Sequence, residues 1–220
     1  MLTAVEIETG PAPSLGVIWL HGLGADGHDF EPIVPELKLR FAVRFVFPHA
    51  PVRPVTINGG MAMRAWYDIL GFDRSAREDD AGIRASATAV TELIDRELER
   101  GLRADRVVLA GFSQGGAIAL HAALREPRVL GGVIALSTYL PLAGTLAAER
   151  SAANERLPIF MAQGTADNVL PLTLGESSRR TLEAQGYAVD WHAYPMAHSV
   201  CLEEVSAIGA WLAALPPSRS

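Results

Sequence analysis

The chain has 220 residues, of which 49% are hydrophobic and 20% are charged. This length and composition predict one globular domain spanning 1–220, with a substantial core, and exclude a disordered chain. The formal net charge of −6 argues against nucleic acid or anionic lipid as an electrostatic partner. No apolar stretch reaches the roughly 18 residues of a membrane span, so stable membrane insertion is not expected.

The N-terminal stretch and the cysteine content predict a cytoplasmic protein. The N-terminal stretch carries Glu6 and Glu8 and lacks the basic and apolar regions of a secretory signal. Cys201 is the only cysteine, which excludes an intrachain disulfide and a multi-cysteine metal site. A reducing compartment is the default expectation for such a chain.

Short apolar runs bounded by glycine or proline alternate with helical patterns along the chain. Strands are predicted at 16–20, 43–47, 107–110, 132–136, 159–162 and 189–194, and the more polar run 2–9 suits an added edge strand. Helices are predicted at 80–100, 114–125, 174–185 and 202–215. This order predicts an α/β fold, with a mostly parallel central sheet covered by helices on both faces. Ligands of such sheets gather at the carboxyl ends of the strands.

The pentapeptide Gly111-Phe112-Ser113-Gln114-Gly115 joins a predicted strand to a predicted helix. This is the setting of a nucleophile elbow, in which a serine occupies a strained turn and exposes its hydroxyl. A side chain at either glycine would crowd the neighbouring strand or helix. The alternative is a turn that only connects two elements, so the interpretation depends on partners for Ser113.

Asp167 and His198 are the candidate partners, because each follows a later predicted strand. The chain order Ser113, Asp167, His198 matches the serine, acid, histidine order of α/β-hydrolases. A serine hydroxyl becomes nucleophilic when an imidazole accepts its proton, and a carboxylate fixes the tautomer of that imidazole. Asp167 could instead be a turn or N-cap aspartate.

The other histidines that we weighed have less favourable positions. His192 lies inside a predicted strand, and His121 lies too far along the helix after Ser113 to reach back. His28 and His49 follow early strands, where surface or capping roles are expected.

The developing oxyanion needs two backbone N–H donors. Gln114 follows the serine and begins the helix, so its N–H is unpaired and favoured by the helix dipole. The glycine-rich loop at 21–27 follows the first buried strand, and we expect the second donor there, at Leu23. The alternative for this loop is an ordinary glycine-rich turn.

Several separated motifs give the chain a resemblance to a known family along nearly its whole length. They are 21–27 with Phe30, 47–51, 61–68, 111–116, 136–141, 164–171 and 198–199. In these motifs the chain resembles the family that unites small bacterial carboxylesterases with acyl-protein thioesterases and lysophospholipases. The resemblance implies an α/β-hydrolase fold, a Ser113, Asp167, His198 triad, and Leu23 and Gln114 as the oxyanion hole, with no cofactor and no metal.

Two positions beside Asp167 depart from this family. Many relatives carry histidine in place of Gln163 and proline in place of Asn168. Neither change removes a catalytic group, but both could alter how this loop frames the substrate.

The segment 57–73 has no clean strand or helix period and is rich in apolar residues. A long irregular segment of this kind is often a lid or an acyl-binding wall. Met63, Trp66 and Leu70 are its candidate substrate contacts, and Val169 could line the same pocket. Core packing is the alternative, above all for Trp66.

These observations predict a serine carboxylesterase that hydrolyses esters of short to medium acyl chains through an acyl-enzyme. The alternative is an acyl-protein thioesterase or lysophospholipase with the same triad, acting on an acyl-thioester or a lysolipid. A non-catalytic binding module is a third hypothesis, and its expected sign, a missing triad member, is absent. Two chains could pair as a homodimer through apolar surface around 57–73.

Overall fold

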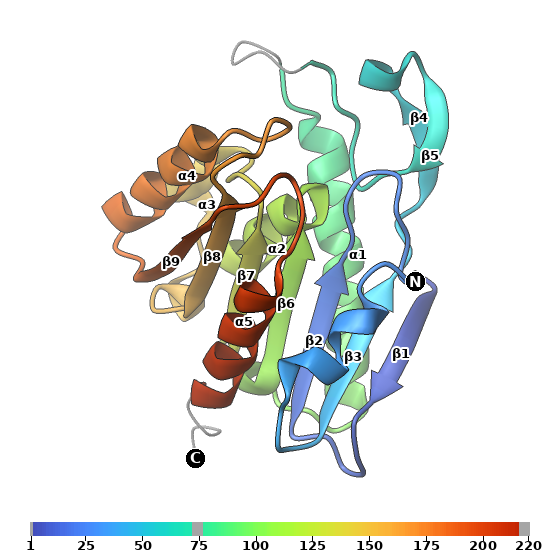
Figure 1. Cartoon of the computed structure of the whole chain (residues 1–220), viewed down its shortest axis with the longest axis vertical. Helices are drawn as coiled ribbons and strands as arrows, with labels where there is room; N and C mark the ends of the chain where they lie inside the picture. The colour runs from blue at the N-terminus through green and yellow to red at the C-terminus, as the bar shows by residue number, and fades with distance from the viewer. Residues whose placement is uncertain (1, 72–76, 216–220) are drawn as a thin grey trace.

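A seven-stranded sheet forms the centre of the protein, in the order β1-β3-β2-β6-β7-β8-β9 (Figure 1). The computed structural model describes residues 2–71 and 77–215. The strands are β1 (Ala4–Glu8), β2 (Leu15–Leu20), β3 (Val43–Pro48), β6 (Val107–Phe112), β7 (Gly132–Leu136), β8 (Ile159–Gly164) and β9 (Val189–Tyr194). β1 pairs antiparallel with β3 at one edge, and the other neighbouring strands of the sheet are parallel.

Helices cover both faces of this sheet. The apolar side chains of α1 (Asp80–Glu99), α2 (Gln114–Arg125), α3 (Leu146–Glu149) and α4 (Leu172–Ala184) share one core with Ile18 and Leu20 of β2. α5 (Leu202–Ala214) and the short helix η2 (Pro35–Leu37) share the opposite core with Val17 and Trp19. Alternate residues of β2 therefore point to opposite faces. The predicted α/β-hydrolase architecture is confirmed. Among the helices of the described residues, none has both the length and the apolar character needed to cross a membrane.

A two-stranded hairpin, β4 (Val52–Val55) and β5 (Met61–Arg64), stands apart from the main sheet. Figure 1 shows it beyond the carboxyl end of β2. The expectation of a segment without strands at 57–73 is therefore wrong for its first half, which contains η3 (Thr56–Asn58) and β5. The hairpin is short, and Val52 and Met61 remain exposed. Its sequence therefore lacks the regular alternation of apolar and polar residues that predicts a half-buried strand. Residues 72 and 73 lie outside the described residues.

The strand order has a topological switch point between β2 and β6. After β2 the chain moves outward to β3, and then returns through α1 to β6 on the other side of β2. A ligand site is expected at such a switch point.

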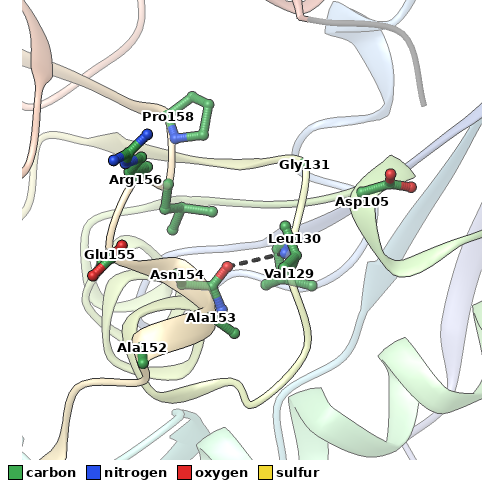
Figure 2. A pocket seen from close by; sticks show the side chains of 11 residues that line it. Asp105, Val129, Leu130, Gly131, Ala152, Ala153, Asn154, Glu155, Arg156 and Pro158 are labelled. Atoms are coloured by element: carbon green, nitrogen blue, oxygen red, sulfur yellow. Dashed lines mark hydrogen bonds between the residues drawn. The ribbon is translucent and has the colours of Figure 1, made fainter. Parts of the chain in front are cut away.

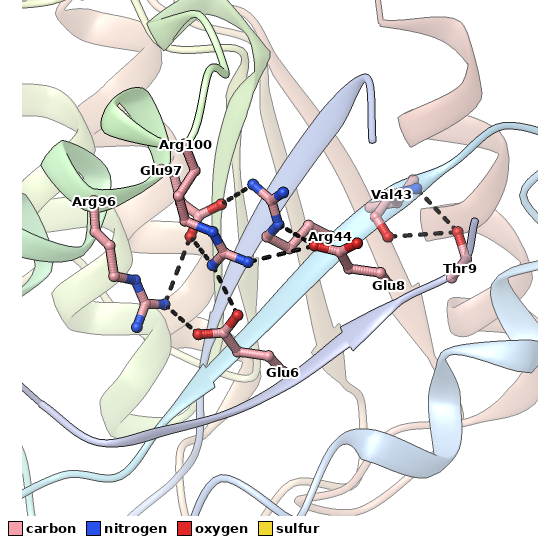
Figure 3. A network of polar contacts seen from close by, with 8 residues as sticks. All are labelled: Glu6, Glu8, Thr9, Val43, Arg44, Arg96, Glu97 and Arg100. Atoms are coloured by element: carbon pink, nitrogen blue, oxygen red, sulfur yellow. Dashed lines mark hydrogen bonds and ion pairs between the residues drawn. The ribbon is translucent and has the colours of Figure 1, made fainter. Parts of the chain in front are cut away.

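An ion-pair network connects the edge strand β1 to α1 (Figure 3). Glu97 of α1 is fully buried, and its carboxylate accepts hydrogen bonds from Arg44 at 3.0 Å and from Arg100 at 2.9 Å. The same two arginines reach Glu8 of β1, and Arg100 also reaches Glu6. A buried carboxylate without partners would be strongly destabilising, so this network makes α1 and the edge strand depend on each other.

Glu204 of α5 is a buried carboxyl group, and its replacement should stabilise the protein. Burial raises the pKa of Glu204 from 4.5 to about 8. Between these pH values the native state holds one proton more than the unfolded state, so the free energy of unfolding falls as pH rises. Glu204→Gln should remove this loss, so its advantage over wild type in the free energy of unfolding should be about 3 kcal/mol larger at pH 8 than at pH 5.

Denaturant unfolding of wild type and variant at both pH values measures this gain. Glu203→Gln is the matched control, because Glu203 is the exposed neighbour. An unchanged pH dependence in Glu204→Gln would contradict the assignment.

Candidate active site

Three side chains from separate loops meet at the carboxyl end of the sheet. Ser113 lies between β6 and α2, Asp167 follows β8, and His198 lies between β9 and α5. The Ser113 hydroxyl lies 2.9 Å from His198 Nε2, and His198 Nδ1 lies 2.7 Å from Asp167 Oδ2. The structure therefore brings together the serine, the histidine and the carboxylate that the sequence predicted.

The turn at Ser113 is strained in the way that a nucleophile elbow requires. Ser113 has φ 54° and ψ −121°, a conformation that residues with a side chain rarely adopt. A Cβ atom at Gly111 would overlap the backbone of Gly115, and one at Gly115 would overlap the backbone of Leu20. The two glycines thus allow β6, α2 and β2 to approach closely enough to hold the turn.

Asp167 is both a turn residue and the partner of the histidine. Its Oδ1 accepts the backbone N–H groups of Val169 and Leu170, each at 2.8 Å, which leaves Oδ2 directed at His198. Gln163 at the end of β8 donates a second hydrogen bond to Oδ2 at 3.2 Å. The carboxylate side chain is fully buried, so these donors replace water around its charge.

The partners of His198 define its tautomer. The ionised carboxylate of Asp167 can only accept, so Nδ1 carries the proton and Nε2 presents a lone pair to Ser113. The ring also packs against Phe112, with 4.7 Å between ring centroids. The Ser113 hydroxyl can donate directly to Nε2, which is the geometry that proton transfer needs.

The two amides predicted as oxyanion donors both remain available. Within residues 2–71 and 77–215, neither the Leu23 N–H nor the Gln114 N–H has a hydrogen-bond acceptor. Gln114 is the first residue of α2, where the helix dipole favours a negative charge. The Leu23 loop is fixed from the hairpin side, because the Gly24 N–H donates to the Arg64 carbonyl at 2.9 Å.

The predicted substrate contacts separate into two groups. Met63 is half-buried and lies next to the Leu23 loop, since its sulfur is 3.9 Å from the position of a Cβ at Gly24. Leu70 and Val169 are 44% and 53% exposed. Trp66, by contrast, is fully buried among core residues, so the expectation that it contacts substrate has no support in this structure.

His21 and Thr138 are residues near the site that the sequence analysis did not evaluate. His21 accepts the Ala50 N–H at Nε2 (3.1 Å), so Nδ1 donates to the Gly22 carbonyl at 2.7 Å. Burial lowers the pKa of His21, which keeps this ring neutral. Thr138 donates to the Ser113 carbonyl at 2.6 Å. His21 follows β2 and Thr138 follows β7, at the same carboxyl end of the sheet as Ser113. This position after a strand is the sequence signal that could have identified both residues.

The other candidate histidines have different surroundings. His192 on β9 pairs with Asp190 at 3.0 Å, and His28 pairs with Glu31. His49 accepts the Gly27 N–H at 3.0 Å. His121 is buried within α2, and burial lowers the pKa of His121 to about 4.

A cavity of about 260 Å³ lies at the opposite end of the sheet (Figure 2). Its walls come from the segments that precede β6, β7 and β8, with Asp105, Gly131 and Pro158 among them. Asn154 closes one side by accepting the Leu130 N–H at 3.0 Å. This cavity is therefore distinct from the site around Ser113.

Comparisons with known proteins agree with this geometry. The family model described as Phospholipase/Carboxylesterase matches residues 3–215. Acyl-protein thioesterase 1 of Neurospora crassa is 44% identical over 89% of this chain and 84% of its own length. Acyl-protein thioesterase 1 of Yarrowia lipolytica is 38% identical over 95% of each chain. The crystal structure of Zea mays acyl-protein thioesterase 2 superposes with a TM-score of 0.84, at 28% identity over 96% of this chain and 99% of that one.

The fold and the family together define the class of protein as an α/β-hydrolase that acts on ester bonds. The chain belongs to the phospholipase/carboxylesterase family. It is a serine hydrolase, as the sequence predicted. The resemblance to the family of carboxylesterases and acyl-protein thioesterases is confirmed, and the two relatives named above are fungal.

Asp167→Asn should leave the fold intact and lower kcat by about 10⁴-fold. The amide can still accept the Val169 and Leu170 N–H groups, but its NH₂ group facing His198 favours the wrong tautomer. Steady-state hydrolysis of a chromogenic ester measures the loss.

Asp190→Asn is the matched control, because Asp190 also pairs with a histidine but is exposed on β9. Equal activities of the two variants would contradict the role given to Asp167.

Proposed function

We propose that this protein is an acyl-protein thioesterase, which hydrolyses the thioester between a fatty acyl chain and a protein cysteine. The observation that carries this proposal is the similarity, over most of the chain, to proteins that bear this name. It revises the sequence-based preference for short- to medium-chain carboxylic esters. Carboxylic ester hydrolysis remains the second candidate, because the matching family model includes carboxylesterases.

In the proposed mechanism Ser113 is the nucleophile, His198 the general base and Asp167 the acid that orients it. His198 Nε2 takes the hydroxyl proton as Ser113 Oγ attacks the acyl carbonyl carbon. The carbonyl oxygen becomes an oxyanion that accepts from the Leu23 and Gln114 amides. The C–S bond then breaks, and the imidazolium returns the proton to the departing sulfur.

The same groups then hydrolyse the acyl-enzyme. His198 removes a proton from a water molecule, the hydroxide attacks the acyl carbon, and Ser113 leaves with that proton. A thiol has a pKa of about 8.5, so a thiolate leaves far more easily than an alkoxide. A triad able to cleave an oxygen ester is therefore sufficient for a thioester.

The hairpin β4–β5 and the loop after Asp167 are proposed as the acyl-binding wall. Met63 places its thioether beside the Leu23 loop, and Leu70 and Val169 offer exposed apolar surface. Flexible methionine suits a wall that must accept chains of different length. The lid function of the segment at 57–73 is proposed on the same grounds.

A substrate panel tests the proposed activity. Wild type should have a higher kcat/KM for a palmitoylated peptide thioester than for a short aryl ester or a lysolipid. Ser113→Ala should lose activity and should also lose labelling by a fluorophosphonate reagent.

A higher kcat/KM for the short aryl ester would contradict the thioesterase proposal. Wild-type protein that neither hydrolyses nor becomes labelled would favour a non-catalytic binding module.

Met63→Ala with Leu70→Ala should shift acyl-length preference by about tenfold in relative kcat/KM, since one methylene of fit is worth that much. Competition between C8 and C16 thioesters measures the shift. Val129→Ala is the control, because Val129 is 42% exposed beside the cavity at the other end of the sheet. An unchanged C8 to C16 ratio would place the acyl site elsewhere.

A further inference from the structure

We propose that Trp66 is a positioning residue that fixes the two oxyanion amides relative to each other. This inference rests on the proposed function, because it concerns the same reaction. It assigns to Trp66 a role different from the substrate contact that the sequence suggested. The evidence is a set of hydrogen bonds that join both halves of the oxyanion hole through this one residue.

Trp66 contacts the Leu23 side of the hole with its side chain. The indole Nε1–H donates to the His21 carbonyl at 2.9 Å. His21 is two residues before Leu23, and its ring packs against the indole with 5.3 Å between ring centroids. The backbone direction at His21, and hence at Leu23, is therefore constrained by the indole.

Trp66 contacts the Gln114 side of the hole with its backbone. Its N–H donates to Gln114 Oε1 at 2.8 Å, and Gln114 Nε2 donates to the carbonyl of the next residue, Tyr67, at 2.7 Å. The Gln114 side chain is thereby held at both ends of its amide. The Trp66 carbonyl in turn accepts from Ser86 of α1, which anchors this residue to the helix layer.

All of these groups are shielded from water. Trp66 is 0%, His21 1% and Gln114 3% exposed. A buried carbonyl or N–H that loses its partner cannot recover it from solvent, so each bond strongly favours one geometry. The spacing of the two amides is then set before substrate arrives, which is what oxyanion stabilisation requires.

Tryptophan combines a large apolar aromatic ring with one N–H group that can only donate. Phenylalanine at position 66 would keep most of the packing and the backbone bond to Gln114. It would leave the His21 carbonyl unpaired, and the Leu23 loop would relax away from the hole. Trp66→Phe should therefore weaken stabilisation of the transition state and leave substrate binding unchanged.

The experiment compares Trp66→Phe with wild type in two assays. With a chromogenic thioester, kcat should fall about tenfold to a hundredfold while KM stays within twofold. An octyl trifluoromethyl ketone forms a tetrahedral adduct with the active serine, and its Ki should rise by the same factor as kcat falls.

Trp19→Phe is the matched control. Trp19 is equally buried, at 1% exposed, but its indole nitrogen has no hydrogen-bond partner among the described residues. Both variants lose the same volume from the core, so both should lower Tm. Trp19→Phe should keep the wild-type kcat and the wild-type Ki.

The proposal is overturned if the two variants have kcat values within twofold of each other, or if kcat falls in Trp66→Phe without a change in Ki. If Trp66→Phe does not fold, Gln114→Met tests the same connection from the other side, with the same expected loss of kcat at constant KM. An inactive wild type overturns the proposed function and this inference together. An active wild type with equal variants overturns this inference alone.

Discussion

The positive φ angle of Ser113 is the constraint on which the rest of the site depends. A serine resists this conformation, and the turn persists because β6, α2 and β2 approach closely at Gly111 and Gly115. The turn places the hydroxyl above the sheet and, in the same step, places the next N–H at the start of α2. One local geometry thus positions both the proposed nucleophilic oxygen and one of the proposed oxyanion donors.

The remaining groups are brought to this turn by loops whose own hydrogen bonds fix them. The Asp167 carboxylate is held by the Val169 and Leu170 amides and by Gln163, so its position does not depend on His198. Gln163 is one of the two positions where the sequence departs from the resemblance, and its side-chain amide donates to Asp167 Oδ2. The departure noted in the sequence therefore alters a partner of the acid and not the acid itself.

The sequence predicted the elements and residues for which a single pattern was unambiguous. The central strands were predictable because nearly every residue in them is buried; these are β2, β3, β6, β7 and β8. The predicted ranges ended too early in β6 and β8, before Phe112 and Gly164. Ser113, Asp167 and His198 were predictable because each follows a strand. The sequence pattern did not predict that β4 and β5 pair. It also did not decide that Trp66 is buried in the core, because an apolar side chain is equally compatible with a core and with a substrate pocket. That distinction depends on long-range contacts such as the one between Trp66 and His21.

We propose, as the basis of catalysis, that Ser113, His198 and Asp167 form one proton-transfer line beside the Leu23 and Gln114 amides. A crystal structure of the covalent phosphonate adduct tests this claim most directly. We expect phosphorus bonded to Ser113 Oγ, with the phosphoryl oxygen within hydrogen-bond distance of the Leu23 and Gln114 nitrogens. An adduct on another residue, or a phosphoryl oxygen directed away from both amides, would contradict it.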